Sequence, residues 1–137
     1  MSDESFGSSW DGDQGDDELE WYHIVDRADE EEDTLKKIAI YRDGLKKFPE
    51  SFELYCSLGV LYKEMGMIED AEKCYEKGLA LNPGDPVIMR NKALILAYDR
   101  EQYDEARKVF ESVLDSDPPY LPIWHSYAQL LDRQFEG

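Results

Sequence analysis

Few side chains in this sequence have the types and the spacing that chemistry requires. The two histidines, His23 and His125, lie 102 residues apart, and neither has a second ligand at metal-site spacing. The sequence contains no glycine-rich phosphate loop and no nucleophile-elbow pattern. Catalysis needs an activated group within hydrogen-bond reach of a second one, and the sequence offers no such pair. We therefore expect that the protein is not an enzyme and uses neither a metal nor another cofactor.

The two cysteines are also expected to have a structural role and not a catalytic one. Cys56 and Cys74 fall in two neighbouring amphipathic segments. There they are better interpreted as small apolar core residues than as a disulfide or a reactive thiol, and reduced cysteines suit a reducing compartment. Residues 1–20 have no apolar stretch and no basic start, so we expect no secretory signal. Together these features favour a cytoplasmic protein.

The charge of the chain is concentrated at its N-terminal end. The 137 residues carry 32 acidic and 15 basic side chains, which gives a net charge of −17. Residues 1–33 hold 14 acids and one base, Arg27, whereas residues 34–137 hold 18 acids and 14 bases. Because an acidic surface repels phosphate groups, we expect no binding to nucleic acid or to anionic membranes. No apolar run approaches the length of a membrane span.

Residues 1–17 have the composition of an acidic disordered tail. One interpretation of this tail is a solubilising leader. The other starts from Phe6 and Trp10, which stand among carboxylates, because aromatic side chains of acidic segments can anchor in grooves. Both interpretations stay open, and the folded domain is expected over residues 18–137.

The clearest folded unit lies in the segment Phe52–Pro83. Apolar residues recur at three- and four-residue spacing over 54–62 and again over 71–81, as in two amphipathic helices. A short break around Gly66 separates the helices, and Pro83 ends the second one. So tight a turn folds the two helices into an antiparallel pair. We expect their backbones to approach closely at the small residues Gly59, Ala71 and Gly78.

This unit recurs along the chain. An apolar or aromatic marker, a second aromatic marker and a proline each return after 34 or 35 residues. Independent markers that share one period indicate a stack of helix–turn–helix units. The one additional residue of the third unit is expected in its turn, over residues 98–102, where a loop tolerates it. The three series are Trp21, Tyr55, Met89 and Trp124; Tyr41, Tyr75 and Phe110; and Pro49, Pro83 and Pro118.

The units resemble the tetratricopeptide repeat. The second unit carries that pattern most fully, with Leu58-Gly59, Tyr62 and Ala71 at the family's positions. The first unit is degenerate, because Lys37 stands at the small-residue position, and the fourth has only its first helix. The resemblance implies an all-α superhelix, a solenoid of about three and a half tetratricopeptide-type helix-turn-helix repeats. The approximate units are 18–51, 52–85, 86–120 and the half-unit 121–135.

The resemblance also implies where a partner would bind. In this family the first helices of successive units line a concave groove. At the matching register, the side chains grade from acidic near the N-terminal end to cationic and aromatic further along. The expected groove residues are Tyr22, Asp26, Val60, Lys63, Arg90, Leu94, Tyr98, His125, Gln129 and Arg133.

The expected function is a non-catalytic protein–protein interaction module, a scaffold or adaptor that binds a peptide or a partner segment in this groove. Lys63, Arg90 and Arg133 suggest a partner with acidic and apolar side chains. The other interpretation is that these cations pair with neighbouring acids such as Glu64. One alternative function is a small acidic chaperone that shields an apolar segment of its client. Another is a scaffold in RNA processing, because residues 106–128 also resemble half-a-tetratricopeptide repeats.

The last predicted helix lies within the apolar segment 121–135. One side can pack on the preceding unit, while Trp124, Tyr127 and Leu131 would cover a second helix that the sequence lacks. A solenoid normally ends in a polar cap. Either the chain is an excerpt of a longer repeat protein, or this face forms a homodimer.

Overall fold

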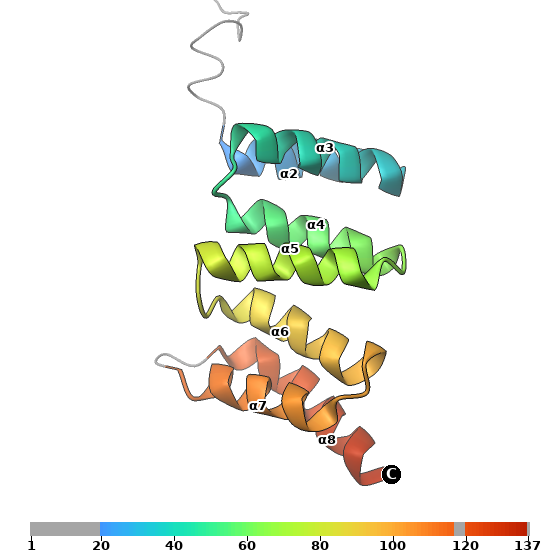
Figure 1. Ribbon diagram of the computed structural model, residues 1–137, viewed down its shortest axis with the longest axis vertical. Helices are drawn as coiled ribbons and strands as arrows, with labels where there is room; N and C mark the ends of the chain where they lie inside the picture. The colour runs from blue at the N-terminus through green and yellow to red at the C-terminus, as the bar shows by residue number, and fades with distance from the viewer. Residues whose placement is uncertain (1–19, 117–119, 137) are drawn as a thin grey trace, which may run out of the picture.

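The structure is a computed structural model, and it describes residues 20–116 and 120–136, with the backbone alone for 134–136. The predicted acidic tail at 1–17 lies outside these residues. The described chain is all-α, and its helices follow one another in antiparallel pairs that stack in one direction (Figure 1). This arrangement confirms the predicted stack of helix pairs. The helices are α2 (Trp21–Asp29), α3 (Thr34–Lys47), α4 (Phe52–Glu64), α5 (Ile68–Leu81), α6 (Pro86–Leu94), α7 (Tyr103–Leu114) and α8 (Trp124–Glu136), with a π-helical segment η1 (Ile95–Asp99) after α6 and a 3₁₀ turn η2 (Leu121–Ile123) before α8.

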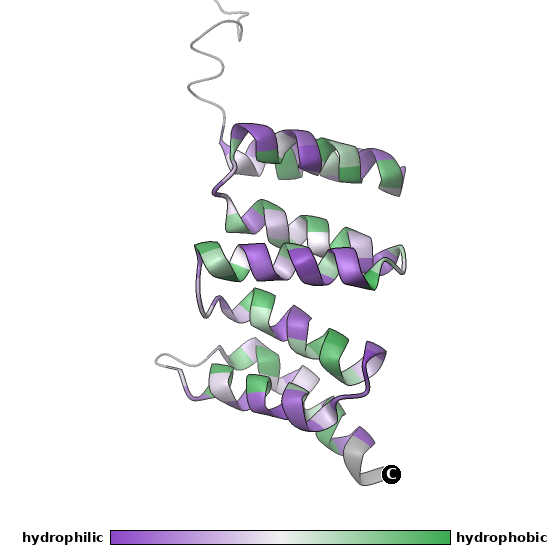
Figure 2. Ribbon diagram, in the orientation of Figure 1, coloured by the Kyte–Doolittle hydropathy of each residue, from purple (hydrophilic) through white to green (hydrophobic). Residues whose placement is uncertain are grey.

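Each helix packs on its neighbours in the sequence. The pairs α2 with α3, α4 with α5, and α6 with α7 form the units, and α3 with α4, α5 with α6, and α7 with α8 join one unit to the next. Hydrophobic and hydrophilic residues are mixed along the helices (Figure 2), and each helix buries some of its apolar residues against its neighbours. The core is therefore a series of small clusters between successive helices, with Leu54, Tyr75, Ile88, Phe110 and Leu130 among the fully buried side chains.

Local signals in the sequence place the ends of these helices. Ser51 and Asp85 stand at equivalent positions of two units and cap α4 and α6 respectively. The Leu54 amide donates to Ser51 Oγ at 3.2 Å, and the Ile88 amide donates to Asp85 Oδ2 at 3.0 Å. Such side chains satisfy amides that the first helical turn leaves unpaired. The predicted break around residue 66 and the predicted helix end before Pro83 are confirmed.

The helix backbones approach closely at the predicted small residues. A Cβ atom on Gly78 would lie 2.7 Å from Ile88 Cδ1, where α5 meets α6. Ala71 is fully buried. The degenerate first unit also has a close approach of two helices at a glycine, since a Cβ atom on Gly44 would lie 2.7 Å from Ile24 Cγ2.

The additional residue of the third unit lies in a helix and not in a loop. The turns between paired helices have three residues in both units, 65–67 and 100–102, so the predicted loop insertion is wrong. The helical segment that begins at Pro86 runs on to Asp99 through η1, one residue longer than α4. In η1 the Arg100 amide donates to the Ile95 carbonyl five residues earlier, at 3.0 Å. A π-helical turn absorbs one residue without ending the helix.

The last helix is only partly covered. Ile123 and Leu130 are fully buried against the preceding unit. Trp124 keeps 52% of its surface exposed, as the sequence pattern predicted. Tyr127 differs from that prediction, because its hydroxyl donates to Glu111 Oε2 of α7 at 2.7 Å and its ring packs on Phe110. The homodimer through this helix stays a prediction.

Candidate functional site

The side chains that could do chemistry are held apart or inert in the described part of the chain. No three or more His, Cys, Asp and Glu side chains among the described residues are grouped to hold a metal ion. His23 has a structural role, since its Nδ1 accepts a hydrogen bond from the Glu20 amide at 2.9 Å at the start of α2. Cys56 and Cys74 are free thiols, and burial raises the pKa of each to about 11. Both thiols therefore stay protonated at neutral pH and are poor nucleophiles. None of the described helices is both long and apolar enough to cross a bilayer.

Three of the predicted groove residues line one pocket between α4 and α6. Val60 and Lys63 reach it from α4 and Leu94 from α6, and its volume is about 220 Å³. We call this hollow the groove pocket. The remaining lining residues, which the sequence argument did not select, are Glu64, Tyr75 and Asn91.

Tyr75 gives the groove pocket a buried polar group. The side chain is 1% exposed, and its hydroxyl has no hydrogen-bond partner among the described residues. Burial raises the pKa of Tyr75, so the hydroxyl stays protonated and keeps its donor. A buried hydroxyl without a partner costs free energy, and a carbonyl or carboxylate oxygen in the pocket would remove that cost. The pocket thus combines apolar walls with the donors Lys63, Tyr75 and Asn91 and with the carboxylate of Glu64.

Lys63 pairs with an acid that the sequence did not indicate. Its Nζ lies 3.7 Å from Asp99 Oδ2, so the ion pair joins the end of α4 to η1. From the sequence, Glu64 was the expected neighbouring acid. Both side chains of the actual pair are partly exposed, and water screens such a pair, so it holds the ammonium weakly. Lys63 therefore has a partner in the structure but stays available to a stronger one.

The cationic end of the predicted groove is built by η1 and α8. The Arg133 guanidinium lies 5.1 Å from the centroid of the Tyr98 ring, and Arg133 Nε donates to the Tyr103 hydroxyl at 3.4 Å. No carboxylate among the described residues forms an ion pair with Arg133. A guanidinium over an aromatic face keeps its charge while its plane is held in place. Arg133 is thus a positioned cation that a partner carboxylate can reach.

Arg90 has a more structural position than the sequence suggested. Its Nε donates to Ser126 Oγ at 3.1 Å, and Nη1 donates to Asn91 Oδ1 at 3.4 Å. Ser126 is buried, so this contact ties α6 to α8. Asn91 in turn donates from Nδ2 to Cys56 Sγ of α4 at 3.6 Å. Arg90 therefore helps to fix the groove pocket in addition to contributing charge.

The remaining predicted groove residues do not join this group. Tyr22 is exposed and packs against Trp21 and His23 of its own helix. Asp26 on α2, and His125 and Gln129 on α8, are exposed. None of these four is among the residues that line the groove pocket. The candidate site therefore consists of the groove pocket on α4 and α6, together with the contacts of Lys63 with Asp99 and of Tyr98 with Arg133 on η1 and α8.

Sequence reasoning missed Glu64, Tyr75 and Asn91 of the pocket lining. It also missed Asp99 and Tyr103, which contact Lys63 and Arg133. Two signals could have found some of these residues. The 35-residue spacing of the third unit marks the π turn that supplies Tyr98 and Asp99, because π-helical turns are frequent at functional sites. The other signal was the position of Asn91 in α6, because this polar residue is partly buried although it is not among the core positions Ile88 and Ala93.

Comparisons with known proteins agree with the fold. Residues 52–85 match the tetratricopeptide repeat family. Among solved structures, the chain is similar to a thermophilic tetratricopeptide repeat protein of Thermus thermophilus, with a TM-score of 0.64 and 23% sequence identity. The similarity covers 81% of this chain and 60% of that one, so this chain spans less than two thirds of the length of that relative. No curated protein matches the chain.

Proposed function

We propose that this chain, which is a tetratricopeptide repeat protein, is a non-catalytic scaffold or adaptor that binds a peptide segment of a partner protein. Proteins of this family generally act as protein–protein interaction modules. The proposed binding surface runs from the groove pocket on α4 and α6 to Arg133 on α8. The observation that carries the proposal is the groove pocket itself, where apolar walls surround the unpaired hydroxyl of Tyr75.

The chemistry of this surface supports a partner with both apolar and acidic side chains. Val60 and Leu94 offer apolar contact within the pocket. Lys63 is held only by a partly exposed ion pair, and Arg133 is positioned by aromatic rings. In peptide recognition, apolar anchors provide most of the affinity and charges set register and specificity. An aliphatic side chain flanked by carboxylates would meet all of these groups.

A chaperone that shields apolar segments is the second candidate. It is favoured by the same apolar walls, and it differs in requiring no charge on the client. The scaffold in RNA processing has less support, because the matched unit at 52–85 is an ordinary tetratricopeptide repeat. The adaptor and the chaperone can be distinguished by whether binding depends on the charge of the peptide.

Fluorescence polarisation with labelled peptides tests the proposal. The probes are ten-residue peptides with fixed leucines, in which neutral glutamines are exchanged stepwise for glutamates. Lys63→Glu and Arg133→Glu are each expected to weaken the acidic peptides by about tenfold, near 1.4 kcal/mol, and to leave the neutral ones unchanged. Lys108→Glu on α7 is the matched control, because its side chain is 72% exposed and lies outside the groove pocket.

Each result assigns a function. Weakening of acidic peptides by the groove variants alone supports the adaptor. The chaperone function is supported if neutral and acidic peptides bind equally well. In that case Leu94→Ser should weaken binding and Lys63→Glu should not. Binding that the control variant changes as much as the groove variants contradicts a site on α4, α6 and α8.

A further inference from the structure

A second hollow lies on a different part of the molecule. A cleft of about 640 Å³ runs between α3 and α5, and α4 forms its floor. It exists because α3 packs on α2 and α4 and is not closely packed against α5; the two helices lie apart in Figure 1. We call it the α3–α5 cleft. Its lining residues and those of the groove pocket have no member in common.

The floor of the α3–α5 cleft is apolar. Ile38 and Leu58 are buried at its base, and Tyr62 is half-buried. At the rim, Leu35 is 62% exposed and Met67 is 41% exposed. Apolar side chains gathered around one hollow offer an anchor site for an apolar or aromatic group.

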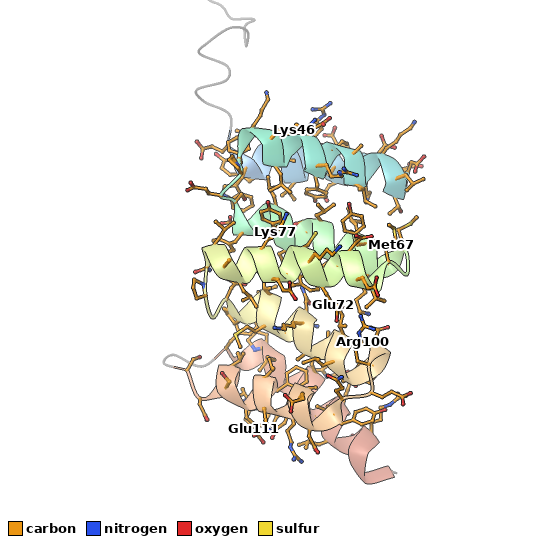
Figure 3. The ribbon with its side chains drawn as sticks, viewed as in Figure 1. Lys46, Met67, Glu72, Lys77, Arg100 and Glu111 are labelled. Carbon is orange, nitrogen blue, oxygen red and sulfur yellow. The ribbon has the colours of Figure 1, made fainter. Side chains whose placement is uncertain are left out.

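The rim of the cleft is basic in an acidic protein. Arg42 and Lys46 line it from α3, and Lys73 and Lys77 line it from α5, against a single lining acid, Asp70. Lys46 and Lys77 are labelled in Figure 3, one on each helix. Lys46 Nζ also lies 3.6 Å from Asp43, but both side chains are more than 70% exposed, so this pair is easily exchanged. Four of the 15 basic residues of the chain thus surround one apolar floor.

We propose that the acidic N-terminal segment, residues 1–18, docks in the α3–α5 cleft of its own chain. Phe6 and Trp10 would lie on the apolar floor, and the carboxylates of the segment would face the basic rim. The segment has seven acidic residues and no basic one, so its charge is complementary to that of the rim. It also has the two large aromatic side chains that an apolar floor selects.

The length and the position of the segment suit this docking. In Figure 1 the chain enters α2 beside the end of α3, because the two helices are antiparallel. The end of α3 carries Lys46. Ten residues separate Trp10 from Glu20 and can span up to about 33 Å, whereas the whole of α3 is about 21 Å long. Because the segment is tethered, its effective concentration at the cleft is high, so weak contacts suffice.

The docked segment would occupy the cleft in place of other acidic, aromatic peptides. The docked segment would contact none of the residues that line the groove pocket, so the groove pocket would stay open to a partner. The proposal stands independently of the proposed function for that reason.

NMR spectroscopy of the full chain tests the docking. The reporter is the indole Nε1–H signal of Trp10, assigned by its loss in Trp10→Phe. Lys73→Glu combined with Lys77→Glu is expected to move this signal to the position of an unstructured tryptophan, and raised salt is expected to do the same. Arg107→Glu combined with Lys108→Glu is the matched control, because it reverses two charges on α7, outside the cleft.

A second measurement observes the cleft itself. Phe6→Ala combined with Trp10→Ala is expected to shift the backbone amide signals of cleft residues such as Leu35, Met67 and Lys77. Ser8→Ala combined with Ser9→Ala, in the same segment, is expected to leave them in place. All of these variants change the terminal segment or side chains that are exposed or partly exposed, so the helical circular dichroism should stay the same in all of them.

The outcomes decide between occupants. A Trp10 signal that stays unstructured in the unaltered chain, or that responds equally to both charge reversals, overturns the proposal. A docked Trp10 signal that returns to the unstructured position on dilution assigns the cleft to the segment of a second copy and overturns docking within one chain. A docked signal that is independent of concentration and lost only in the cleft variants supports it.

Discussion

The ring of Tyr75 lies in the space that a side chain on Gly59 would need. A Cβ atom on residue 59 would be 2.5 Å from Tyr75 Cε1 and 2.9 Å from Cδ1. This contact brings α4 and α5 together in the best-defined unit. The same tyrosine lines the groove pocket, so the approach of the two helices also places the unpaired hydroxyl at the candidate site.

Gly59→Ala is expected to destabilise the protein by about 1–3 kcal/mol, because the new methyl group must displace a buried ring. Urea denaturation followed by circular dichroism measures the loss. Tyr75→Leu alone should also destabilise the protein, but Gly59→Ala should cost less in the Tyr75→Leu background, since a smaller side chain makes room for the methyl group. An alanine variant as stable as the unaltered protein would show that the ring can move without cost.

Glu101→Gly is expected to stabilise the protein. Glu101 has a φ of 55°, and the equivalent turn residue of the second unit is a glycine, Gly66, with a φ of 80°. The left-handed conformation costs a residue with a Cβ atom about 1–2 kcal/mol, and the greater freedom of glycine in the unfolded chain offsets part of the gain. We expect a net gain of about 0.5–1 kcal/mol in the free energy of unfolding, measured by urea denaturation. Lys108 is exposed within α7, where glycine is unfavourable. Lys108→Gly should therefore lower the free energy of unfolding by about 1 kcal/mol.

The stability of the protein is expected to fall as the pH rises through the alkaline range. Thiols of the unfolded chain ionise near pH 8.5, whereas burial raises the pKa of Cys56 and Cys74 to about 11. Between these values the unfolded state loses thiol protons that the folded state keeps, so the free energy of unfolding decreases with pH. Cys56→Ala combined with Cys74→Ala should make this decrease shallower between pH 8 and pH 10, because the variant lacks both thiol protons. Urea titrations at several pH values measure the free energy of unfolding of both proteins. An equally steep decrease with pH in the variant would contradict a contribution from the two thiols.

Self-association, if the last helix forms the predicted homodimer, is expected to depend on Leu121 and Trp124. These side chains are 60% and 52% exposed, so Leu121→Ser combined with Trp124→Ser should change the stability of the monomer little. Light scattering coupled to gel filtration, at increasing protein concentration, should show a dimer mass that the double variant loses. A monomer mass at all concentrations would exclude the homodimer.

The repeat and its helix pairs could be predicted from the sequence because the signals for them are local. Helical periodicity, the turn at Gly66 and the capping residues Ser51 and Asp85 act within one or two turns of chain. Their recurrence at one period then implies stacking, because a single pair cannot bury its apolar face. Val60, Lys63 and Leu94 were selected from the resemblance to the tetratricopeptide family, which implies that matching positions of successive first helices line one groove, and all three line the groove pocket.

The tertiary structure alone decided which groups meet across units. Whether an inserted residue enlarges a loop or forms a π turn depends on how α6 packs against α7, and that choice brings Asp99 to Lys63 and Tyr98 to Arg133. The unpaired hydroxyl of Tyr75 and the α3–α5 cleft likewise depend on distances between helices that belong to different parts of the sequence. Spacing along a chain fixes which face a side chain occupies, but the distance to a partner on another helix is set by the packing of every side chain between them.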